Sequence, residues 1–431
     1  MNTNSKNDNG DSVTRRDFMK TSAIAAAGSL AAAELAVSRS AHAAGSDEIR
    51  VGLIGCGGRG TGAAAQCMQA SPRVRIAAMA DVFRDRVDGS REALEKRDER
   101  AKFDDSRCFV GFDGYKELIA DGVDAVILAT PPHFRPFHLE EAVKAGCHVF
   151  MEKPVAVDPV GIRKVIAAGE MADRKGLSIV AGTQRRHEAR YQELIYRIHA
   201  GAIGDIVAAR CYWNQGGLWV NEPRKEWSDM EWQLRNWLYF TWLSGDHIVE
   251  QHVHNIDVVN WAIGDHPIRA MGLGGRQVRT DPIYGHIFDH FAVEFEYPNN
   301  VFVLSTCRQI DGCANRVHEV VHGTIGSATT QHETVIRGAN SWRFEADNPN
   351  PYVQEHKDLI ASIEGGTHYN EARQVAESTL CAIMGRMSTY TGQEVTWEQA
   401  MNSELDLTPP TYEFGDLPLP PVAMPGQTKL I

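Results

Sequence analysis

Residues 49–60 read IRVGLIGCGGRG, an apolar run that leads directly into a glycine-rich turn. The apolar run is typical of a buried strand, and a helix is expected to follow the turn. Gly55, Gly57 and Gly60 have the G-x-G-x-x-G spacing. Glycine is required there because the turn is tight and the backbone must approach a pyrophosphate at the N-terminus of the following helix. The stretch therefore predicts a dinucleotide-binding turn, in which Gly58 and Arg59 also face the nucleotide.

A second apolar run, VRIAAMAD, ends at Asp81, about twenty residues after the turn. A carboxylate at that position is placed to accept hydrogen bonds from the adenosine ribose. It favours NAD as the cofactor because it repels the 2′-phosphate of NADP. Arg84, three residues further on, leaves NADP open as an alternative.

The order of the apolar runs indicates the fold class. Up to about Arg186, strand-like runs such as VDAVILAT and LSIVAGT alternate with helical patterns, which predicts a doubly wound parallel sheet with helices on both faces. After about residue 200 the runs are longer and richer in β-formers, and HFAVEFEYPNNVFVLSTCRQI is typical of a hairpin. We therefore expect a second α/β domain with a large, mainly antiparallel open sheet. A helix-rich insertion at about 223–263 interrupts it. The expected divisions are 1–43, 44–186, 187–407 and a Pro-rich tail at 408–431.

The first 43 residues have the anatomy of an export signal. TRRDFMK, at 14–20, carries a pair of arginines and is followed by a short alanine-rich run and by AHA at 41–43, a small-x-small cleavage site. An amphipathic helix or a membrane anchor is the alternative. The twin arginines favour export of the folded protein to the periplasm or another extracytoplasmic space, with a mature chain that starts near Ala44.

The amino-acid composition limits the classes of partner that the protein is expected to bind. The formal net charge is −12, so we expect no broad surface for nucleic acid. No run after the leader is long and apolar enough to predict an integral membrane segment. The eight cysteines are scattered without a CxxC pair, which indicates mostly buried thiols and leaves disulfides open.

Residues 129–154, ATPPHFRPFHLEEAVKAGCHVFMEKP, resemble the signature of the Gfo/Idh/MocA oxidoreductase family. The resemblance extends from about residue 49 to about residue 400. It implies a Rossmann domain, a second open-sheet domain, a substrate in the cleft between them and a homo-oligomer formed through the C-terminal sheet. It also implies that Lys153 lies beside the nicotinamide and hydrogen-bonds the reacting hydroxyl. The other cofactor contacts that it implies are Thr130, Pro131, His133, Glu152, Gln184 and Arg185, and Arg186 is a candidate contact to substrate.

The second candidate catalytic stretch is SGDHIVEQHVHNIDVVNW, at 244–261. On one continuous helix its spacing would place His247, Glu250, His254, Asp257 and Trp261 on a single face. By the family pattern, Glu250, His254 and Asp257 take the catalytic positions, and an imidazole such as His254 titrates in the right range to accept the hydroxyl proton.

Two positions depart from the family pattern, because the first acid is usually aspartate rather than Glu250 and His252 replaces a usual glycine. Both changes reshape the pocket, and we count His252 among the residues that contact substrate. A divalent metal bound by these groups is the competing chemical interpretation. Hydride transfer needs no metal, so none is expected.

Six of the nine tryptophans fall within residues 213–242. Indole faces stack on the C–H faces of sugar rings, and we predict that Trp213, Trp219 and Trp237 contact substrate while others pack the insertion. The leading hypothesis is an exported enzyme that transfers a hydride between a hydroxyl of a sugar, glycoside or cyclic polyol and tightly bound NAD(H). The alternatives are an NAD-dependent glycosidase, which oxidises, eliminates and re-reduces its substrate, and a sugar-binding protein without catalysis.

Overall fold

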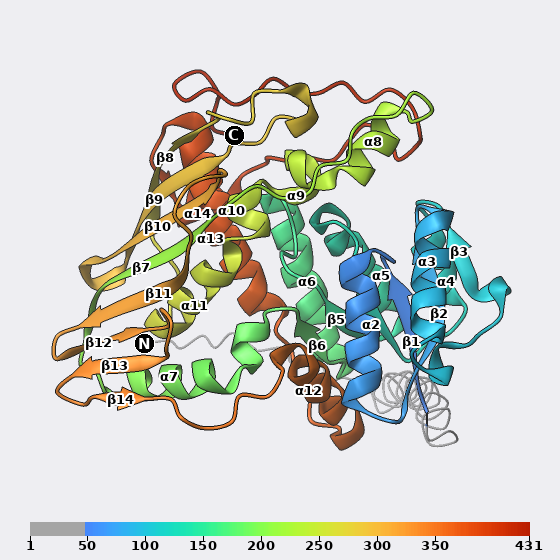
Figure 1. Cartoon of the computed structure of the whole chain (residues 1–431), viewed down its shortest axis with the longest axis horizontal. Coiled ribbons are helices and arrows are strands. Elements are labelled where there is room, and N and C mark those ends of the chain that lie inside the picture. Colours follow the sequence, from blue (N-terminus) through green and yellow to red (C-terminus); the bar gives the residue numbers. More distant parts are fainter. Residues whose placement is uncertain (1–47) are drawn as a thin grey trace, which may run out of the picture. The chain divides into compact units, whose positions relative to one another are not determined.

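The computed structural model describes residues 48–431, so the predicted export signal lies outside the described residues (Figure 1). The first sheet has six strands in the order β3-β2-β1-β4-β5-β6. Their bounds are β1 Ile49–Ile54, β2 Val74–Asp81, β3 Cys108–Val110, β4 Ala125–Leu128, β5 His148–Met151 and β6 Ile179–Ala181. The pairs β1–β4, β2–β3, β4–β5 and β5–β6 are parallel. The order reverses at β1 and β4, which is the point where such sheets bind ligands beyond the carboxyl ends of their strands.

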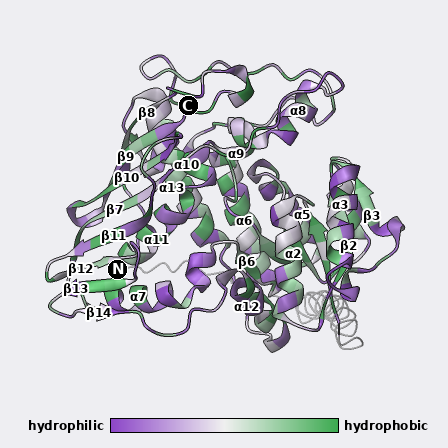
Figure 2. Ribbon diagram, in the orientation of Figure 1, coloured by the Kyte–Doolittle hydropathy of each residue, from purple (hydrophilic) through white to green (hydrophobic). Residues whose placement is uncertain are grey.

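Helices cover both faces of this sheet. Helices α2 and α3 contact each other on one face of the sheet, and α4, α5 and α6 pack together on the other. Their bounds are α2 Gly58–Ala70, α3 Arg84–Glu95, α4 Gly114–Ala120, α5 Arg135–Ala145 and α6 Pro159–Lys175. Gly146 and Gly176 end α5 and α6 with φ of 83° and 65°, the left-handed conformation common at helix C-termini. Figure 2 shows α3 as largely hydrophilic, as expected of a helix with one solvated face.

The second sheet has nine strands in the order β14-β13-β12-β11-β7-β10-β9-β8-β15. Their bounds are β7 Ile206–Gln215, β8 Arg269–Gly275, β9 His290–Tyr297, β10 Val301–Gln309, β11 Arg316–Gly323, β12 Gly326–Thr329, β13 Val335–Gly338, β14 Trp342–Arg343 and β15 Val395–Thr396. All its pairs are antiparallel except β7–β10, and the predicted hairpin is β9–β10. The predicted fold class, a Rossmann-like parallel sheet and a mainly antiparallel second sheet, is confirmed.

One face of the second sheet carries the core and the other is open. Helices α11 (Val253–Ile263) and α13 (Ala372–Thr391) pack on the inner face. Along β10 the burial alternates, so Val303 and Ser305 point inward while Phe302 and Leu304 point outward. The remaining helices are α7 Ala189–His199, α8 Asp229–Arg235, α9 Thr241–Ser244, α10 His247–Glu250, α12 Pro351–Gly365 and α14 Trp397–Asn402.

Short 3-10 turns complete the chain and carry several of the predicted site residues. They lie at Glu99–Ala101, Asp105–Arg107, Pro132–Phe134, Gln184–His187, Trp237–Tyr239, Pro282–Tyr284 and Pro298–Asn300. The tail from residue 408 contains no helix or strand. All eight cysteines are free thiols, and six of them are buried.

The prediction of one continuous helix through residues 247–261 is wrong. Helix α10 ends at Glu250 and α11 begins at Val253, with Gln251 and His252 between them. The amide of His252 bonds the carbonyl of His247, five residues back, so the helical phase changes at this point. Side chains before and after the break therefore do not share one face.

Candidate active site

The turn after β1 is built as the glycine spacing predicts. Gly55 has φ of +97°, and a Cβ on it would lie 2.4 Å from the backbone nitrogen of Thr130. A Cβ on Gly60 would lie 1.9 Å from the carbonyl oxygen of Gly55, so the helix packs on the turn without room for a side chain. Gly57 and Gly58 have nothing within 4 Å of that position. The open space lies at the N-terminus of α2, whose free N–H groups attract a phosphate.

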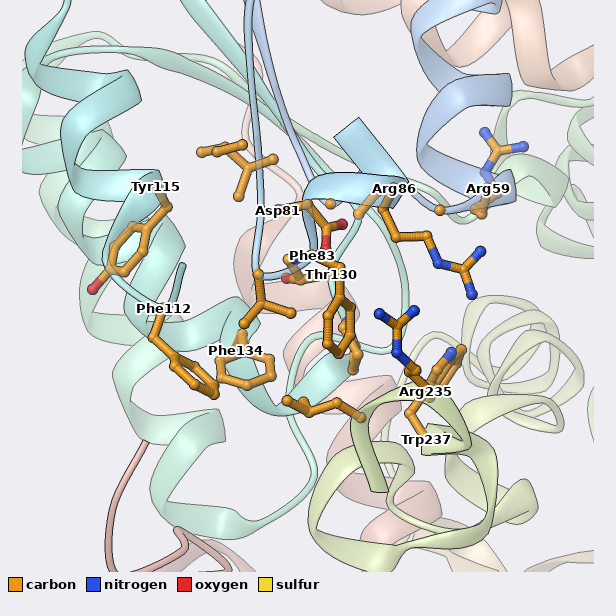
Figure 3. A pocket seen from close by; sticks show the side chains of 18 of the residues that line it. Arg59, Asp81, Phe83, Arg86, Phe112, Tyr115, Thr130, Phe134, Arg235 and Trp237 are labelled. Atoms are coloured by element: carbon orange, nitrogen blue, oxygen red, sulfur yellow. Dashed lines mark hydrogen bonds between the residues drawn. The ribbon is translucent and has the colours of Figure 1, made fainter. Parts of the chain in front are cut away.

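A cavity of about 510 Å³ extends from this turn (Figure 3). Its lining from the first sheet comprises residues of the turn, residues after β2 and residues after β4. The predicted contacts among them are Gly55, Gly57, Gly58, Arg59, Asp81, Thr130 and Pro131. Aromatic side chains close the end around Asp81, and Figure 3 shows Phe83, Phe112, Tyr115 and Phe134 gathered there. The glycine cradle and the helix terminus fit the pyrophosphate of a dinucleotide, and the aromatic end fits a base.

Asp81 is held in place by the backbone. Its two carboxylate oxygens accept from the amides of Cys56, at 2.7 Å, and of Phe83, at 3.0 Å. Burial raises the pKa of this carboxyl against the lowering effect of those two hydrogen bonds. Each oxygen keeps a lone pair for a ribose hydroxyl.

Arg84 does not reach the cavity. Its guanidinium pairs on the surface with Asp88 at 2.8 Å and Asp105 at 2.6 Å. Arg86, two residues later on the same helix, lines the cavity instead. The prediction that Arg84 contacts the cofactor is therefore corrected. The helical turn points residue 84 away from Asp81, and Arg86 is the arginine of this helix that lines the cavity.

Lys153 follows β5 and meets the second domain. Its Nζ donates to the backbone oxygen of Glu250 at 2.5 Å and to the Glu250 carboxylate at 3.1 Å. Both side chains are about nine-tenths buried. The two predicted catalytic groups, 97 residues apart in the chain, are thus in direct contact.

His254 lies on the first turn of α11, close enough to Lys153 for that positive charge to affect its pKa. Its ring stacks on Trp213 of β7, with centroids 5.5 Å apart and an interplanar angle of 24°. Burial lowers the pKa of His254 well below its usual value, and the positive charges of Lys153 and Arg185 lower it further. The imidazole is therefore neutral near pH 7, which is the form that can accept a proton.

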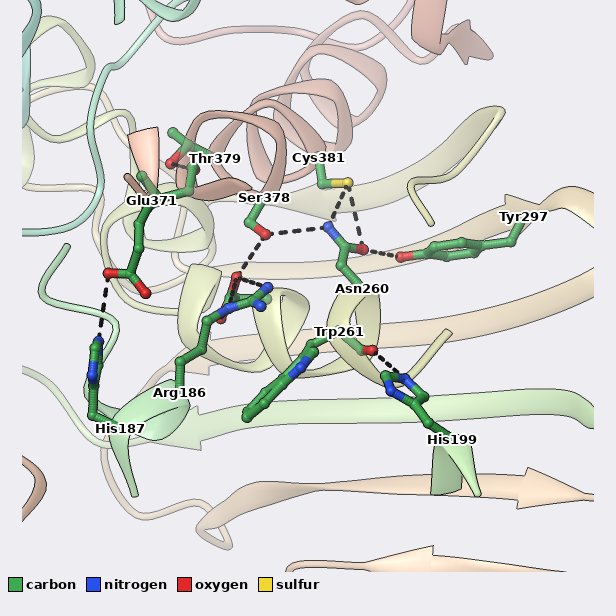
Figure 4. A network of polar contacts seen from close by, with 12 residues as sticks. Arg186, His187, His199, Asn260, Trp261, Tyr297, Glu371, Ser378, Thr379 and Cys381 are labelled. Carbon is green, nitrogen blue, oxygen red and sulfur yellow. Dashed lines mark hydrogen bonds and ion pairs between the residues drawn. The ribbon is translucent and has the colours of Figure 1, made fainter. Parts of the chain in front are cut away.

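Asp257 pairs with two residues of a polar network, Arg186 and Ser378, which Figure 4 shows close together. Arg186 donates to both of its oxygens at 2.8 Å, and the Ser378 hydroxyl donates at 2.7 Å. Asp257 is 2% exposed. These contacts place Asp257 and Arg186 in a polar network under the site, which positions α11, rather than beside Lys153.

His252 does not face the substrate side. It is fully buried, and its Nε2 pairs with the Ser305 hydroxyl of β10 at 2.8 Å and lies 3.7 Å from the Cys211 thiol. The change of helical phase at this residue turns its ring toward the inner face of the second sheet. The expectation that His252 contacts substrate is corrected accordingly.

Arg185 lies in the 3-10 turn Gln184–His187, next to Trp213. Arg185 pairs with the buried Glu319 carboxylate of β11, and its guanidinium lies 5.5 Å from the ring centre of Trp213. Neither Gln184 nor Arg185 lines the nucleotide cavity. Arg185 therefore holds Trp213, and through it the ring of His254.

His133 and Glu152 also have roles other than lining the cavity. His133 is buried, and its Nε2 pairs with the Tyr412 hydroxyl at 2.8 Å. Glu152 directly precedes Lys153 in the chain, and its carboxylate pairs with the guanidinium of Arg59. This ion pair links the glycine turn to the end of β5. Arg59 is held from its other side by the buried Glu355, at 3.6 Å.

Trp219 and Trp237 line the cavity next to the glycine turn, whereas Trp213 stacks on His254. The prediction grouped all three as sugar contacts, and only Trp213 is placed for that role. Sequence reasoning missed Arg86, Arg235, Glu319 and Glu355, because a single charged residue in a helix or strand carries no local signal of its partner.

Among residues 48–431, no helix has the length and apolar character needed to cross a membrane. Nor does that part of the chain hold a group of three or more His, Cys, Asp or Glu side chains arranged to bind a metal ion.

This fold and the glycine turn are those of a protein that joins a dinucleotide-binding Rossmann domain to a second, mainly antiparallel α/β part. Residues 49–182 match the profile described as oxidoreductase family, NAD-binding Rossmann fold, and residues 191–329 match the GFO/IDH/MocA C-terminal domain. Together these two profiles cover most of the described chain. The chain belongs to the Gfo/Idh/MocA oxidoreductase family.

Curated relatives include two different activities. Inositol 2-dehydrogenase 4 of Saccharopolyspora erythraea is 32% identical over 164 residues, which are 38% of this chain and 45% of the relative. The 2,7-anhydro-N-acetylneuraminate hydratase of Escherichia coli K12 is 28% identical over 177 residues, or 41% of this chain and 43% of the relative. The matched region thus spans less than half of each relative.

Solved structures share the fold over most of the chain. The aldose-aldose oxidoreductase of Caulobacter crescentus, solved with glycerol, has a TM-score of 0.64 at 17% identity and covers 81% of this chain and 99% of its own. A 3-ketoreductase of Actinomadura kijaniata, solved with NADP, has a TM-score of 0.62 at 17% identity and covers 79% of this chain and 98% of its own.

Proposed function

We propose that this protein transfers a hydride between a hydroxyl-bearing carbon of a sugar, glycoside or cyclic polyol and a bound NAD(H). The contact of Lys153 with Glu250, beside His254, carries this proposal. It assembles a cation, a carboxylate and a neutral imidazole from both domains at the carboxyl end of β5. The relatives that act on inositol, and the oxidoreductase that acts on aldoses, support this substrate class.

The residues of the chain divide the proton chemistry between them. When bound, the nicotinamide accepts or returns the hydride. Lys153 donates a hydrogen bond to the reacting oxygen and stabilises the negative charge that develops there. His254, which burial and neighbouring cations keep neutral, accepts the proton of the hydroxyl. Trp213, which is only partly buried beside His254, supplies an aromatic surface on which a sugar ring can stack.

A redox-neutral cleavage or hydration is the second candidate. The longer carboxylate of Glu250 lies within the catalytic group, where it can abstract the acidified proton next to an oxidised carbon. The hydratase relative supports this alternative. A panel of sugars, glycosides and polyols, analysed by mass spectrometry, separates the two. Loss of two daltons indicates oxidation, whereas cleavage or hydration without a redox change indicates the second candidate. A protein that binds a member of the panel without altering it would be a sugar-binding protein without catalysis.

We also propose that the twin-arginine segment at 14–20 exports the folded protein with its cofactor to the periplasm. If the folded protein crosses the membrane with its cofactor, the cofactor must not dissociate on the way, so its binding must be tight. Protein purified without added nucleotide is therefore expected to carry nearly one NAD(H) per chain. Denaturation and quantification of the released nucleotide test this. An empty site would contradict tight binding. Export itself is tested by fractionating cells that express the native chain and a variant in which Arg15 and Arg16 are lysine.

The open face of the second sheet supports a homo-oligomer. Its outward side chains include Met271 and Leu273 on β8 and Phe302 and Leu304 on β10, each at least two-fifths exposed. An apolar patch of this kind is typical of an interface. Light scattering of the wild type and of Leu273→Asp is expected to show an oligomer that the charge disrupts. A monomeric wild type would contradict the proposal.

A further inference from the structure

The nucleotide cavity has a second wall that does not belong to the first sheet. Its residues from the second domain are Trp219, Asn221, Leu234, Arg235 and Trp237, all between β7 and α9. Figure 3 shows Arg235 beside the ring of Phe83, with Trp237 next to it, on the side where Arg86 also reaches the cavity. The segment 216–240 therefore covers the aromatic end of the cavity, near Asp81.

Arg235 ties this segment to the Rossmann domain. Its guanidinium forms two hydrogen bonds with the Asp85 carboxylate, at 2.9 Å and 3.1 Å, and lies 3.8 Å from the ring centre of Phe83. Glu231, one turn earlier on α8, holds the same side chain at 2.9 Å. The Arg235 side chain is only 15% exposed. The arginine thus bridges the two domains at the edge of the cavity.

The C-terminal tail fastens the segment from outside. Phe414 stacks on Phe83, with ring centres 5.9 Å apart, and also contacts Phe112 at 5.5 Å. Beyond it, the backbone oxygen of Leu417 accepts from the Gln233 side chain at 2.7 Å, and its amide donates to Asp229 at 3.1 Å. Residues 412–417 therefore join the aromatic wall of the cavity to α8.

We propose that Arg235 and Trp237 are cofactor-binding residues supplied by the second domain, which cover the adenosine half of the dinucleotide. This inference rests on the proposed binding of NAD(H) in this cavity. Because Arg235 is fastened to Asp85 and Phe83, and α8 is fastened to the tail, the segment must separate from the Rossmann domain before the nucleotide leaves. Slow release of the cofactor is then a property of this wall rather than of the glycine turn.

The test measures how fast NADH leaves. Wild-type protein loaded with NADH is mixed with excess NAD, and the loss of energy transfer from tryptophan to NADH gives the dissociation rate. Arg235→Ala is expected to release NADH at least tenfold faster. Arg84→Ala is the matched control, because Arg84 lies next to Asp85 on α3, forms ion pairs only at the surface and does not line the cavity. It is expected to change the rate less than twofold.

Trp237→Leu gives a second route, since it removes a wall residue without touching the ion pair with Asp85. Its expected effect is again at least tenfold, and it decides the matter if Arg235→Ala does not fold. Rates in both variants equal to that of Arg84→Ala would overturn the inference, even with NADH tightly bound. A wild type that binds no NADH at equilibrium would instead overturn the proposed function itself.

Discussion

Replacing Gly57 by alanine is expected to impair nucleotide binding without weakening the fold. Gly57 lines the cavity, its φ of −71° suits any residue, and a Cβ there meets nothing within 4 Å. The new methyl group therefore enters the space where the pyrophosphate approaches the backbone. Loss of one hydrogen bond to a charged phosphate costs about 1.5–3 kcal/mol. That corresponds to a Kd for NAD raised about tenfold to a hundredfold.

Gly60→Ala is the matched comparison, with the opposite expectation. Its Cβ would lie 1.9 Å from the Gly55 carbonyl, so the turn and α2 must move apart. Overpacking of this kind costs about 1–3 kcal/mol, which should lower the melting temperature of the nucleotide-free protein.

Isothermal titration with NAD and thermal melting of the nucleotide-free variants measure the two effects separately. A Gly57→Ala protein that binds NAD as the wild type does would refute the assignment of this turn to the pyrophosphate. A Gly60→Ala protein as stable as the wild type would refute the packing argument.

Four further results are expected. Lys153→Ala and His254→Ala should each lower turnover about a hundredfold to ten-thousandfold while the purified protein keeps its NAD, and turnover within tenfold of wild type would remove the assigned roles. Asp81→Ala should weaken NAD relative to NADP in competition binding, because the carboxylate repels the 2′-phosphate, and an unchanged ratio would place the ribose contact elsewhere. Burial lowers the pKa of His252 and of His356 to about 3, so below pH 6.5 the unfolded chain binds protons that the folded chain does not. The free energy of unfolding should therefore fall as the pH drops below 6.5, by about 2 kcal/mol for each histidine at pH 5. Thermal melting of the wild type and of His252→Asn at pH 7 and pH 5 measures this effect, and an equal loss of stability in both proteins would speak against the His252 contribution. Dialysis against a chelator should leave turnover unchanged, and a loss that a divalent ion restores would overturn the metal-free mechanism.

Local patterns in the chain were enough to predict the first domain. The apolar run before Gly55, the glycine spacing and the strand ending at Asp81 each depend on residues close in sequence, so their physics is visible there. Apart from β3 and β4, strands that follow one another in this domain are neighbours in the sheet, and their parallel direction brings the residues after β1, β4 and β5 to one edge. Predicting Lys153 as catalytic, however, required the family resemblance.

The tertiary structure alone decided which side chains meet. Lys153 and Glu250 are 97 residues apart, and Arg235 and Asp85 are 150 apart, so neither contact has a local signal. The direction of His252 depends on a single break in helical phase, which spacing rules for a continuous helix cannot foresee. Such contacts arise when two domains, each folded by its own short-range pattern, bury their facing surfaces together. For that reason the sequence by itself determined the kind of protein and its dinucleotide turn, and the packing of the second domain decided which residues form the second wall of the cavity and which side chains meet Lys153.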